Sequence, residues 1–418
     1  MIGPLKRVFE HAALTGDLTI IDARGRTCRF GDGTGEPVVT RLMDRRLEWQ
    51  LIVDPGLVLA EAYMDGRLVI EQGGLYRFLE IVLQHNAGYA PSRWILLHDI
   101  VRKLTRRISQ FNRIARARRN VRSHYDIDGA IYDLFLDSDH QYSCAYFENE
   151  NQSLEHAQLA KKRHIAAKLR LRPGDRVLDI GSGWGGLGIY LARAADVHVT
   201  GVTLSDRQLE ASRERASRLD LARKVSFEPL DYRQIEGRFN RIVSVGMFEH
   251  VGVGYYQDFF DKVCQLLEDD GVALIHSIGR FDGPAATNGF IARYIFPGGY
   301  IPALSEVFPA IERSGLLVTD IEILRLHYAD TLRRWRHRFA ANRHRAATLR
   351  DERFCRMWEF YLAASETAFR YQNMMVFQIQ LARRQDALPL RRDYMYEDEN
   401  AYRERDRKIA EVPRLAGE

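Results

Sequence analysis

A short strand, a glycine-rich turn and a helix follow one another in the segment Val177-Leu-Asp-Ile-Gly-Ser-Gly-Trp-Gly-Gly186. Glycines in such a turn adopt positive φ angles and let the backbone approach a ligand closely. Strands are expected at 176–180, 198–204, 225–230, 241–245 and 272–276, and helices at 185–195, 205–219 and 255–268. This alternation predicts an α/β fold with a doubly wound, mostly parallel sheet and helices on both of its faces.

The pattern divides the chain into three parts. Residues 1–100 predict a smaller α+β domain, and residues 123–418 contain the doubly wound unit together with a mostly helical stretch at 330–385. Between them, residues 101–122 carry nine Lys and Arg side chains and no acid. Leu104, Ile108 and Phe111 recur there at helical spacing, which predicts a basic amphipathic linker helix.

Inside the first part, strands are expected at 17–22 and 26–30 around a turn at 23–25, and helices at 55–63 and 74–85. Pro55 suits the first turn of a helix. Leu47, Trp49, Leu51 and Val53 stand at every second position, which predicts a half-buried strand.

Composition narrows the class of protein further. No apolar run approaches the ~20 residues that cross a bilayer, and the N-terminus has no apolar signal region. The four cysteines lie far apart with no CxxC pair, so neither a disulfide framework nor a cysteine zinc site is expected. The net charge is +5 in 418 residues. These features predict a cytoplasmic, two-domain protein without a bound metal.

The glycine loop resembles the first motif of the class I S-adenosylmethionine methyltransferases, in which the loop backbone meets the methionine part of the cofactor. Most members end the second strand with an acid that binds the ribose hydroxyls. This chain has Thr203 and Leu204 there, followed by Gln208. After the third strand, Asp231 and Tyr232 are expected to form the adenine edge of the site. The resemblance therefore implies a Rossmann-like class I methyltransferase fold.

Five further segments carry a narrower resemblance, to the cyclopropane fatty acid synthases and mycolic acid cyclopropane synthases. They are Gln141-Tyr-Ser-Cys-Ala-Tyr-Phe147, Gly246-Met-Phe-Glu-His-Val-Gly252, Leu274-Ile-His-Ser-Ile-Gly279, Ile295-Phe-Pro-Gly-Gly-Tyr-Ile-Pro302 and His327-Tyr328. The likeness runs from about residue 123 to 380, and the N-terminal part resembles the lipid-handling domain of the phospholipid-modifying members.

This resemblance implies a cyclopropane-fatty-acyl-phospholipid synthase. Such an enzyme transfers a methyl group from S-adenosylmethionine to a cis double bond in an acyl chain of an unsaturated phospholipid. The resulting cation loses a proton from the new methyl group to a bound bicarbonate ion and closes into a ring. The implied bicarbonate pocket consists of Cys144, Glu249, His276, Ile278 through its backbone, and Tyr328. The implied S-adenosylmethionine site consists of Tyr142, Ser143, Asp179, Gly181, Gly183, Thr203, Leu204, Gln208, Asp231 and Tyr232.

A phospholipid substrate requires contact with a membrane surface. The linker segment and a second arginine cluster at 333–350 are candidates, since each Lys or Arg near anionic lipid contributes ~1 kcal/mol. Such runs also form solvated faces or pair with acids elsewhere in the chain. We therefore expect peripheral association with the inner face of the cell membrane. Nucleic acid is the rival polyanion, and no nucleic-acid motif favours it. The N-terminal domain is a candidate homodimer contact.

Other readings of single residues remain open at this level. Cys144 between aromatic residues is either a nucleophile or a buried apolar side chain. Glu249-His250 lacks the HExxH spacing of a metal site. His276 at a strand end is also typical of a core histidine. A methyl-branched or methylene product is the alternative to a ring product. A non-catalytic lipid-binding protein is the alternative to an enzyme. Tyr142, Tyr146, Phe147, Trp184, Phe248 and Tyr328 are candidate aromatic faces for the sulfonium and the cation.

Overall fold

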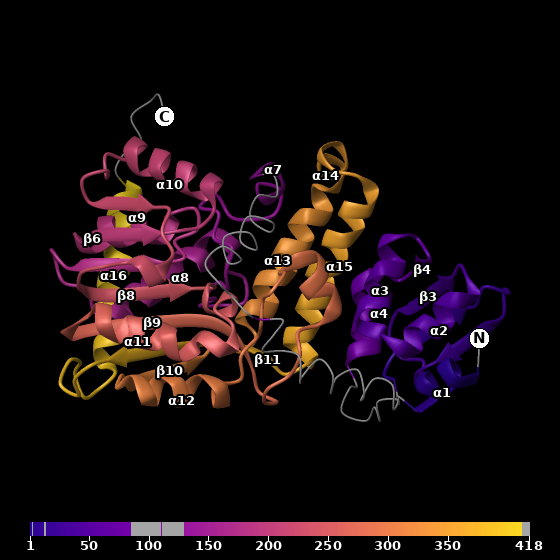
Figure 1. Cartoon of the computed structure of the whole chain (residues 1–418). Coiled ribbons are helices and arrows are strands. Elements are labelled where there is room, and N and C mark those ends of the chain that lie inside the picture. Colours follow the sequence, from indigo (N-terminus) through magenta and orange to yellow (C-terminus); the bar gives the residue numbers. More distant parts are fainter. Residues whose placement is uncertain (2, 12–13, 85–109, 111–128, 412–418) are drawn as a thin grey trace.

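The structure is a computed structural model that describes residues 1, 3–11, 14–84, 110 and 129–411 (Figure 1). Apart from Gln110, the expected linker helix at 101–122 lies outside the described residues. The N-terminal domain contains a four-stranded sheet, and the rest of the chain is built on a seven-stranded sheet.

The N-terminal domain contains both helices and a sheet, as predicted. The strand order of this sheet is β2-β1-β3-β4. The elements of the domain are α1 (Gly3–His11), β1 (Asp17–Ile21), β2 (Thr27–Phe30), β3 (Pro37–Leu42), α2 (Arg45–Val53), α3 (Pro55–Met64), β4 (Leu68–Gln72) and α4 (Gly74–Leu83). The predicted hairpin is confirmed. Asp22 Oδ1 accepts hydrogen bonds from the backbone nitrogens of Arg24 and Arg26, both at 2.9 Å, and Gly25 has a φ of 76°.

The strand predicted around Leu47 is wrong, because this segment is helix α2. Asp44 caps the helix by accepting from Leu47 N at 2.9 Å. Leu47 is buried, whereas Trp49 and Val53 are 57% and 52% exposed. The alternation of apolar residues therefore did not reflect a two-residue period. The spacing of four between Leu47 and Leu51 was the meaningful one.

The large sheet has the strand order β10-β11-β9-β8-β5-β6-β7. Its strands are β5 (Arg176–Ile180), β6 (His198–Val202), β7 (Val225–Glu228), β8 (Phe239–Val245), β9 (Leu267–Arg280), β10 (Leu317–Ile323) and β11 (Met374–Ala382). The five strands predicted from the sequence are β5 to β9, and they pair in parallel as expected. Strand β11 pairs antiparallel with both β9 and β10.

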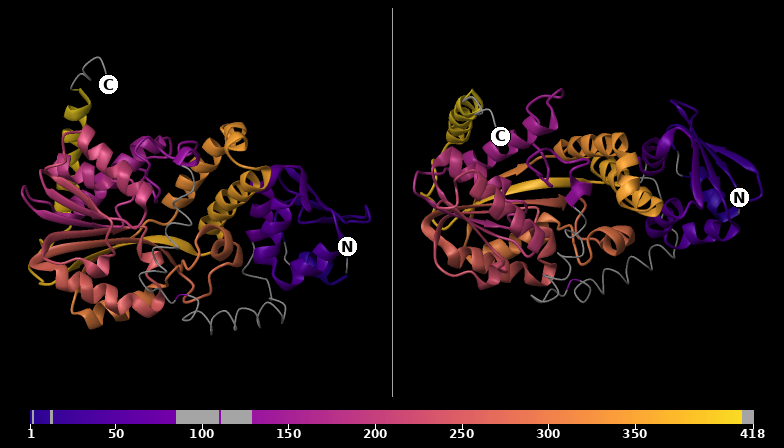
Figure 2. Two further views of the ribbon diagram at one scale, coloured as in Figure 1. Left: turned by 45° about the horizontal axis from the view of Figure 1, so that its top comes forward. Right: turned by 90° about the horizontal axis from the view of Figure 1, so that it is seen from above.

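Helices cover both faces of this sheet, as predicted (Figures 1 and 2). The helices of this part of the chain are α7 (Gly129–Tyr132), α8 (Leu154–Leu169), α9 (Gly186–Ala195), α10 (Asp206–Arg218), α11 (Tyr256–Leu266), α12 (Leu304–Ser314), α13 (His327–Ala341), α14 (Arg343–Leu349), α15 (Glu352–Tyr371) and α16 (Asp393–Glu411). Val177 packs with α8, α9 and α10 on one face, and Leu178 packs with α11 and α12 on the other. Adjacent strand residues point to opposite faces, so the apolar run in β5 serves both layers.

The prediction that residues 330–385 are mostly helical is only partly correct. Helices α13, α14 and α15 are present, but the segment ends in the nine-residue strand β11. All of β11 except Met374 is buried, because it lies between two other strands. Its polar residues, Gln378 and Gln380, alternate with apolar ones over only a few positions, a pattern too short to distinguish a strand from a buried helix in sequence.

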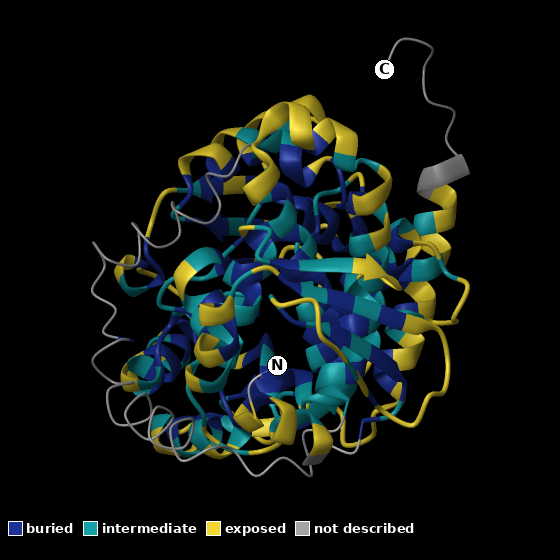
Figure 3. Ribbon diagram, turned by 90° about the vertical axis from the view of Figure 1, so that its right-hand side faces the viewer, coloured by how far each residue is buried: buried dark blue, intermediate teal, exposed yellow. Residues whose placement is uncertain are grey.

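Helices α13 and α15 stand between the large sheet and the N-terminal domain (Figure 1). Helix α15 packs against α3 and α4, and apolar residues of both domains belong to one core cluster. Polar contacts add to it: Tyr63 donates to Glu359 at 3.2 Å, and Arg353 Nε lies 2.8 Å from Asp65. Seen from the N-terminal side, buried residues fill the interior and exposed residues follow the outer turns (Figure 3).

The arginine cluster at 333–350 is largely engaged within the protein. Arg336 pairs with Glu366 at 2.9 Å, and Arg338 pairs with Glu155 at 2.8 Å. Arg343 bridges Glu352 and Glu359 on α15 at 2.6 and 2.7 Å. Of the two interpretations of this run, internal ion pairing therefore describes these three arginines.

Two further findings concern membranes and thiols. Across the ranges that the structure describes, no helix combines the length and apolar character needed to span a bilayer. The four cysteines, all within those ranges, are free thiols.

Candidate functional site

Two cavities meet at the carboxyl ends of the parallel strands, where ligands bind in doubly wound sheets. The larger has a volume of about 490 Å³ and the smaller about 150 Å³. Tyr142, Ser143, Gly246 and His250 line both cavities, so the two spaces share a wall. A group held in one cavity can therefore be presented to a group held in the other.

The smaller cavity lies over the glycine loop. All ten residues expected at the S-adenosylmethionine site line it, from Tyr142 and Ser143 to Asp231 and Tyr232. Gly181 has a φ of 84°, and a Cβ atom there would lie 2.7 Å from Met247 Cβ. Only glycine fits this conformation and this approach. The loop thus brings bare backbone to the cavity, as the sequence predicted.

Asp179, at the end of β5, is buried beneath this cavity. Its Oδ2 atom has no hydrogen-bond partner within the described part of the chain. Burial raises the pKa of Asp179 to about 7. A buried carboxylate without a partner is costly, and a cationic ligand would offset that cost. The ammonium group of S-adenosylmethionine has the charge and donors that this carboxylate lacks.

Polar groups replace the missing ribose acid at the end of β6. Thr203 Oγ1 donates to Gln208 Oε1 at 3.0 Å, which fixes the orientation of the Gln208 amide. Ser205 caps α10, as predicted, by accepting from Gln208 N. Asp231 is held by Arg233 at 2.7 Å. The cofactor cavity is therefore lined by oriented amide, hydroxyl and carboxylate groups.

Lys161 is a buried residue behind this site that the sequence analysis missed. Its Nζ donates to Ser143 Oγ at 2.8 Å and to Gln141 Oε1 at 2.5 Å. Burial lowers the pKa of Lys161 to about 8. Ser143 faces both cavities, so Lys161 orients a residue of the shared wall. Its position within an ordinary helix gives no sequence signal.

The larger cavity reaches all five residues of the expected bicarbonate pocket: Cys144, Glu249, His276, Ile278 and Tyr328. Glu249 Oε1 accepts from Ile278 N at 2.6 Å, so this backbone group is directed at the carboxylate. Glu249 Oε2 has no hydrogen-bond partner among the residues described. Burial raises the pKa of Glu249 to about 7. A small anion that carries a hydroxyl group fits this orphaned acceptor, because the hydroxyl can donate to it.

His276 and Tyr328 complete this end of the cavity. Gln378 Nε2 lies 3.1 Å from His276 Nδ1, a contact that the sequence analysis did not foresee. Burial lowers the pKa of His276 to about 3, so the ring is neutral. The Tyr328 ring packs edge-on against Phe369 and Trp335 at centroid distances of 4.8 and 5.9 Å. A neutral imidazole and a phenol both offer donors to an anion.

Cys144 is not arranged as a nucleophile. It is buried, its thiol donates to Ala145 O at 3.3 Å, and burial raises its pKa. The thiolate is the reactive form, so this thiol is inert. Within the described ranges, no group of three His, Cys, Asp or Glu side chains could hold a metal ion.

Only part of the expected aromatic lining is correct. Tyr142, Trp184 and Tyr328 line one or both cavities, whereas Phe248, Tyr146 and Phe147 line neither. Tyr146 instead stacks between His164 and His327, at centroid distances of 4.2 and 4.8 Å. Its ring is thus occupied within the fold, and it does not face a ligand.

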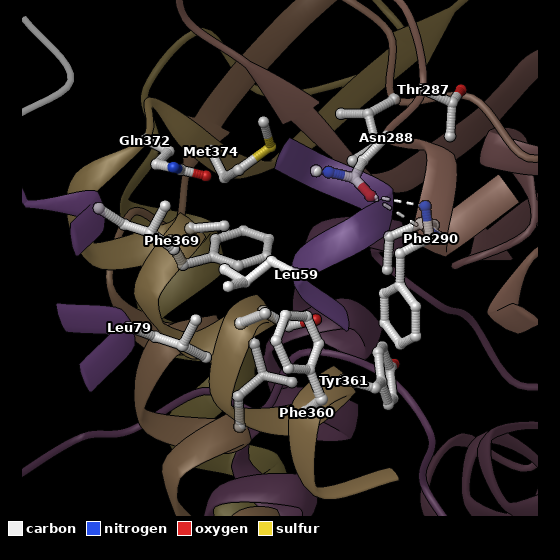
Figure 4. Close-up of a pocket in the computed structure, with 18 of the residues that line it drawn as sticks. Leu59, Leu79, Thr287, Asn288, Phe290, Phe360, Tyr361, Phe369, Gln372 and Met374 are labelled. Carbon is white, nitrogen blue, oxygen red and sulfur yellow. Dashed lines mark hydrogen bonds between the residues drawn. The ribbon is translucent and has the colours of Figure 1, made fainter. Parts of the chain in front are cut away.

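The rest of the larger cavity is apolar and involves both domains. Figure 4 shows Leu59 of α3, Leu79 of α4, and Phe360 and Phe369 of α15 gathered around it. Deeper residues of the N-terminal sheet also line it, including Ile20 and Leu42. The exposed Asn288 lines it as well, so the wall reaches the surface there. None of these residues was expected at the site from the sequence.

The buried carboxyl of Glu249 makes a testable contribution to stability. In the unfolded chain its pKa has the ordinary value of 4.5, and in the folded protein about 7. The folded state thus holds the proton more tightly, and this stabilisation is lost as pH rises through 7. We expect Glu249→Gln, relative to wild type, to gain up to about 3 kcal/mol in unfolding free energy between pH 4.5 and 8. Denaturant unfolding in bicarbonate-free buffer measures it, and a difference that does not change with pH would contradict it.

The fold and the site define a class I S-adenosylmethionine-dependent methyltransferase. Comparison with known families gives a match to mycolic acid cyclopropane synthetase over residues 112–379. The chain belongs to this family, and it is an S-adenosylmethionine-dependent enzyme of the cyclopropane synthase type.

Individual relatives agree with this assignment. The chain is 36% identical over 334 residues to the cyclopropane-fatty-acyl-phospholipid synthase of Escherichia coli K12, covering 80% of this chain and 85% of that one. It is 45% identical over 254 residues to a probable fatty acid methyltransferase of Pseudomonas putida, covering 59% of this chain and 64% of that protein's length. The cyclopropane synthase MmaA2 of Mycobacterium tuberculosis superposes with a TM-score of 0.61 at 34% identity, covering 63% and 98%.

Proposed function

We propose that this protein is a cyclopropane-fatty-acyl-phospholipid synthase that uses bicarbonate as its general base. Membership of the family supports S-adenosylmethionine-dependent cyclopropanation. The observation that carries the finer proposal is the larger cavity. It begins among apolar residues of the N-terminal domain, reaches Glu249, His276 and Tyr328, and shares a wall with the cofactor cavity.

The proposed reaction balances without a redox partner. The π electrons of the double bond attack the methyl carbon of S-adenosylmethionine, and the sulfur keeps the electron pair of the broken C–S bond. The neighbouring carbon of the chain becomes cationic. A proton then leaves the new methyl carbon, and the electrons of that C–H bond close the ring. Bicarbonate supplies the base that takes this proton.

The chain's own residues provide what this chemistry needs. An alkene is a weak nucleophile, so it must be held close to the methyl group in a dry site. The cavity walls of Leu59, Phe360 and Phe369 exclude water and match a hydrocarbon chain. Its volume of about 490 Å³ falls in the usual range of ~300–1,000 Å³ for ligand pockets. Tyr142 and Tyr328 offer ring faces to positive charge.

Glu249 and His276 are proposed to hold the base. Glu249 Oε2, which has no hydrogen-bond partner in the described part of the chain, suits the hydroxyl group of bicarbonate, and a donor from His276 suits its charged oxygens. A carboxylate next to a bare anion would repel it, so the hydroxyl hydrogen has to lie between them. The buried position of both side chains makes these interactions stronger than in water.

The test is a product assay with labelled S-adenosylmethionine and vesicles of monounsaturated phospholipid. Mass spectrometry and proton spectra of the acyl chains distinguish a ring from an exocyclic methylene or a methyl branch. We expect a ring product whose rate depends on added bicarbonate in carbon dioxide-free buffer. A methyl-branched or methylene product would reject ring formation while leaving methyl transfer to the acyl chain in place. Absence of any modified chain would reject the proposal.

We also propose that helix α2 is the surface that contacts the membrane. Its outer side exposes Trp49 and Val53 next to Arg45 and Arg46, while Leu51 on its inner side lines the larger cavity. Tryptophan favours the membrane interface, and arginine favours anionic head groups. The same helix therefore joins a lipid-facing side to the space proposed for the acyl chain.

Replacing Trp49 with glutamate is expected to weaken binding to anionic phospholipid vesicles roughly tenfold or more, because a buried aromatic contributes ~1.5–3 kcal/mol. Co-sedimentation with vesicles measures the bound fraction. Tyr396→Glu is the matched control, since Tyr396 is 67% exposed on α16, in the other domain. Equal binding of the two variants to vesicles would show that α2 does not contact the membrane.

A further inference from the structure

Three buried or half-buried polar residues form a row across adjacent strands of the large sheet. Glu322 on β10 stands directly opposite Gln378 on β11, and Gln378 stands directly opposite His276 on β9. Residues paired in this way project from the same face of a sheet. Helix α8 covers this face and contributes Lys168 to the row. His276 at one end of the row belongs to the larger cavity.

The orientation of the Gln378 amide follows from Lys168. Lys168 Nζ donates to Gln378 Oε1 at 2.7 Å. An ammonium group can only donate, so the atom it contacts must be the amide oxygen. The amide nitrogen consequently faces His276 Nδ1, at 3.1 Å. Both Gln378 and Lys168 are almost completely buried, so water does not compete for these contacts.

This contact selects one form of the histidine ring. An amide nitrogen only donates, so His276 Nδ1 must accept and cannot carry a proton. Because burial keeps the ring neutral, its single proton then resides on Nε2. Nε2 is the nitrogen that remains able to donate to a bound anion.

Lys168 has a second partner besides Gln378, the carboxylate of Glu322. Glu322 also lies 2.7 Å from His164 Nε2. His164 Nδ1 lies 3.3 Å from Glu399. Although burial opposes it, the hydrogen bonds and charges of His164 and Lys168 lower the pKa of Glu322 to about 2. Lys168 and Glu322 thus form a pair of opposite charges, and the neutral amide of Gln378 lies between Lys168 and His276.

We infer that Gln378, oriented by Lys168, is a positioning residue that fixes His276 as the Nε2–H tautomer, so that the ring donates to a small anion in the larger cavity. That the anion is bicarbonate rests on the function proposed above. Partners of this kind orient functional histidines elsewhere by the same physical means. The polar residues at alternate positions of an otherwise apolar strand, Gln378 and Gln380, are the sequence signal.

The kinetic test compares Gln378→Met with Gln380→Met. Gln380 is equally buried on the same strand, but its amide nitrogen donates to Lys168 O and to the Tyr394 hydroxyl, at 2.6 and 2.7 Å. Both variants lose comparable hydrogen bonds, and only the first loses contact with His276. We expect Gln378→Met to raise the bicarbonate concentration for half-maximal rate roughly tenfold, with the KM for S-adenosylmethionine unchanged and the rate restored by excess bicarbonate. Gln380→Met should keep the wild-type value.

A spectroscopic readout separates this inference from the proposed function. Nitrogen-15 labelling of histidine reports which ring nitrogen carries the proton, and the His276 signals are those missing from the spectrum of His276→Gln. The expected result is protonated Nε2 in the wild type and a mixture of tautomers in Gln378→Met. Wild-type protonation on Nδ1 would overturn the inference, as would Gln378→Met behaving like Gln380→Met in both measurements. A wild-type rate independent of bicarbonate would instead reject bicarbonate as the base. The nitrogen-15 spectra would then still test whether Gln378 fixes the tautomer of His276.

Discussion

Replacing Glu249 with glutamine is expected to slow ring formation by roughly 10²- to 10⁴-fold, the usual contribution of a group that positions proton transfer. The substitution keeps the shape of the side chain and replaces one carboxylate oxygen by an amide nitrogen. Oε2, the acceptor without a partner in the described chain, then becomes a donor or loses its charge. The hydroxyl of the proposed base would lose its anchor.

The measurement is the rate of ring formation at saturating S-adenosylmethionine, alongside calorimetry with S-adenosylhomocysteine. Cofactor affinity should stay within about threefold of the wild type, because Glu249 lines the larger cavity and not the cofactor cavity. A variant that retains more than a tenth of the wild-type rate would exclude Glu249 from the proposed base pocket. Parallel loss of cofactor affinity would point to a general structural defect.

The second large effect is expected at Asp179. Asp179→Asn should weaken binding of S-adenosylhomocysteine by roughly 10- to 150-fold, because a hydrogen bond to a charged group contributes ~1.5–3 kcal/mol. The reason is the buried Oδ2 atom, which the cofactor's ammonium group would satisfy. The asparagine keeps the shape and removes the charge, so packing of the glycine loop is preserved.

Asp320→Asn is the control for this measurement. Asp320, on β10, is also a buried carboxylate, but it pairs with Arg392 and lines neither cavity. Calorimetry should give wild-type affinity for this variant. Equal affinities of the Asp179 and Asp320 variants would show that the cofactor's positive charge does not depend on Asp179.

The parallel core of the fold could be predicted because its signals are local. Strands β5 to β9 each contain buried Val, Ile, Leu or Phe residues, and the glycine loop and the Ser205 cap mark where helices begin. The resemblance to the cyclopropane synthases implied that motifs far apart in sequence meet at one site, and the carboxyl ends of parallel strands do lie along one edge of the sheet. The fifteen expected site residues do line the two cavities.

Errors arose where a pattern had two readings. The alternation around Leu47 fitted a strand, but the Asp44 cap and the packing of Leu47 made it a helix. Strand β11 looked helical because the alternation of Gln378 and Gln380 with apolar residues is too short to distinguish a strand from a buried helix. Tyr146 was assigned to the ligand, but two histidines from distant segments cover its ring.

The sequence by itself determined the class of fold and the cofactor loop, since these depend on backbone requirements and a short motif. Its resemblance to the cyclopropane synthases supplied the candidate catalytic side chains. Only the tertiary structure decided how Lys168 and Gln378 orient His276, how Lys161 supports Ser143, and that a hydrocarbon-lined space joins the two domains. Such contacts link residues more than 100 positions apart or lie behind the motif, and no local pattern encodes them. A cavity is a property of packed surfaces, so it exists only once the N-terminal domain rests on α15.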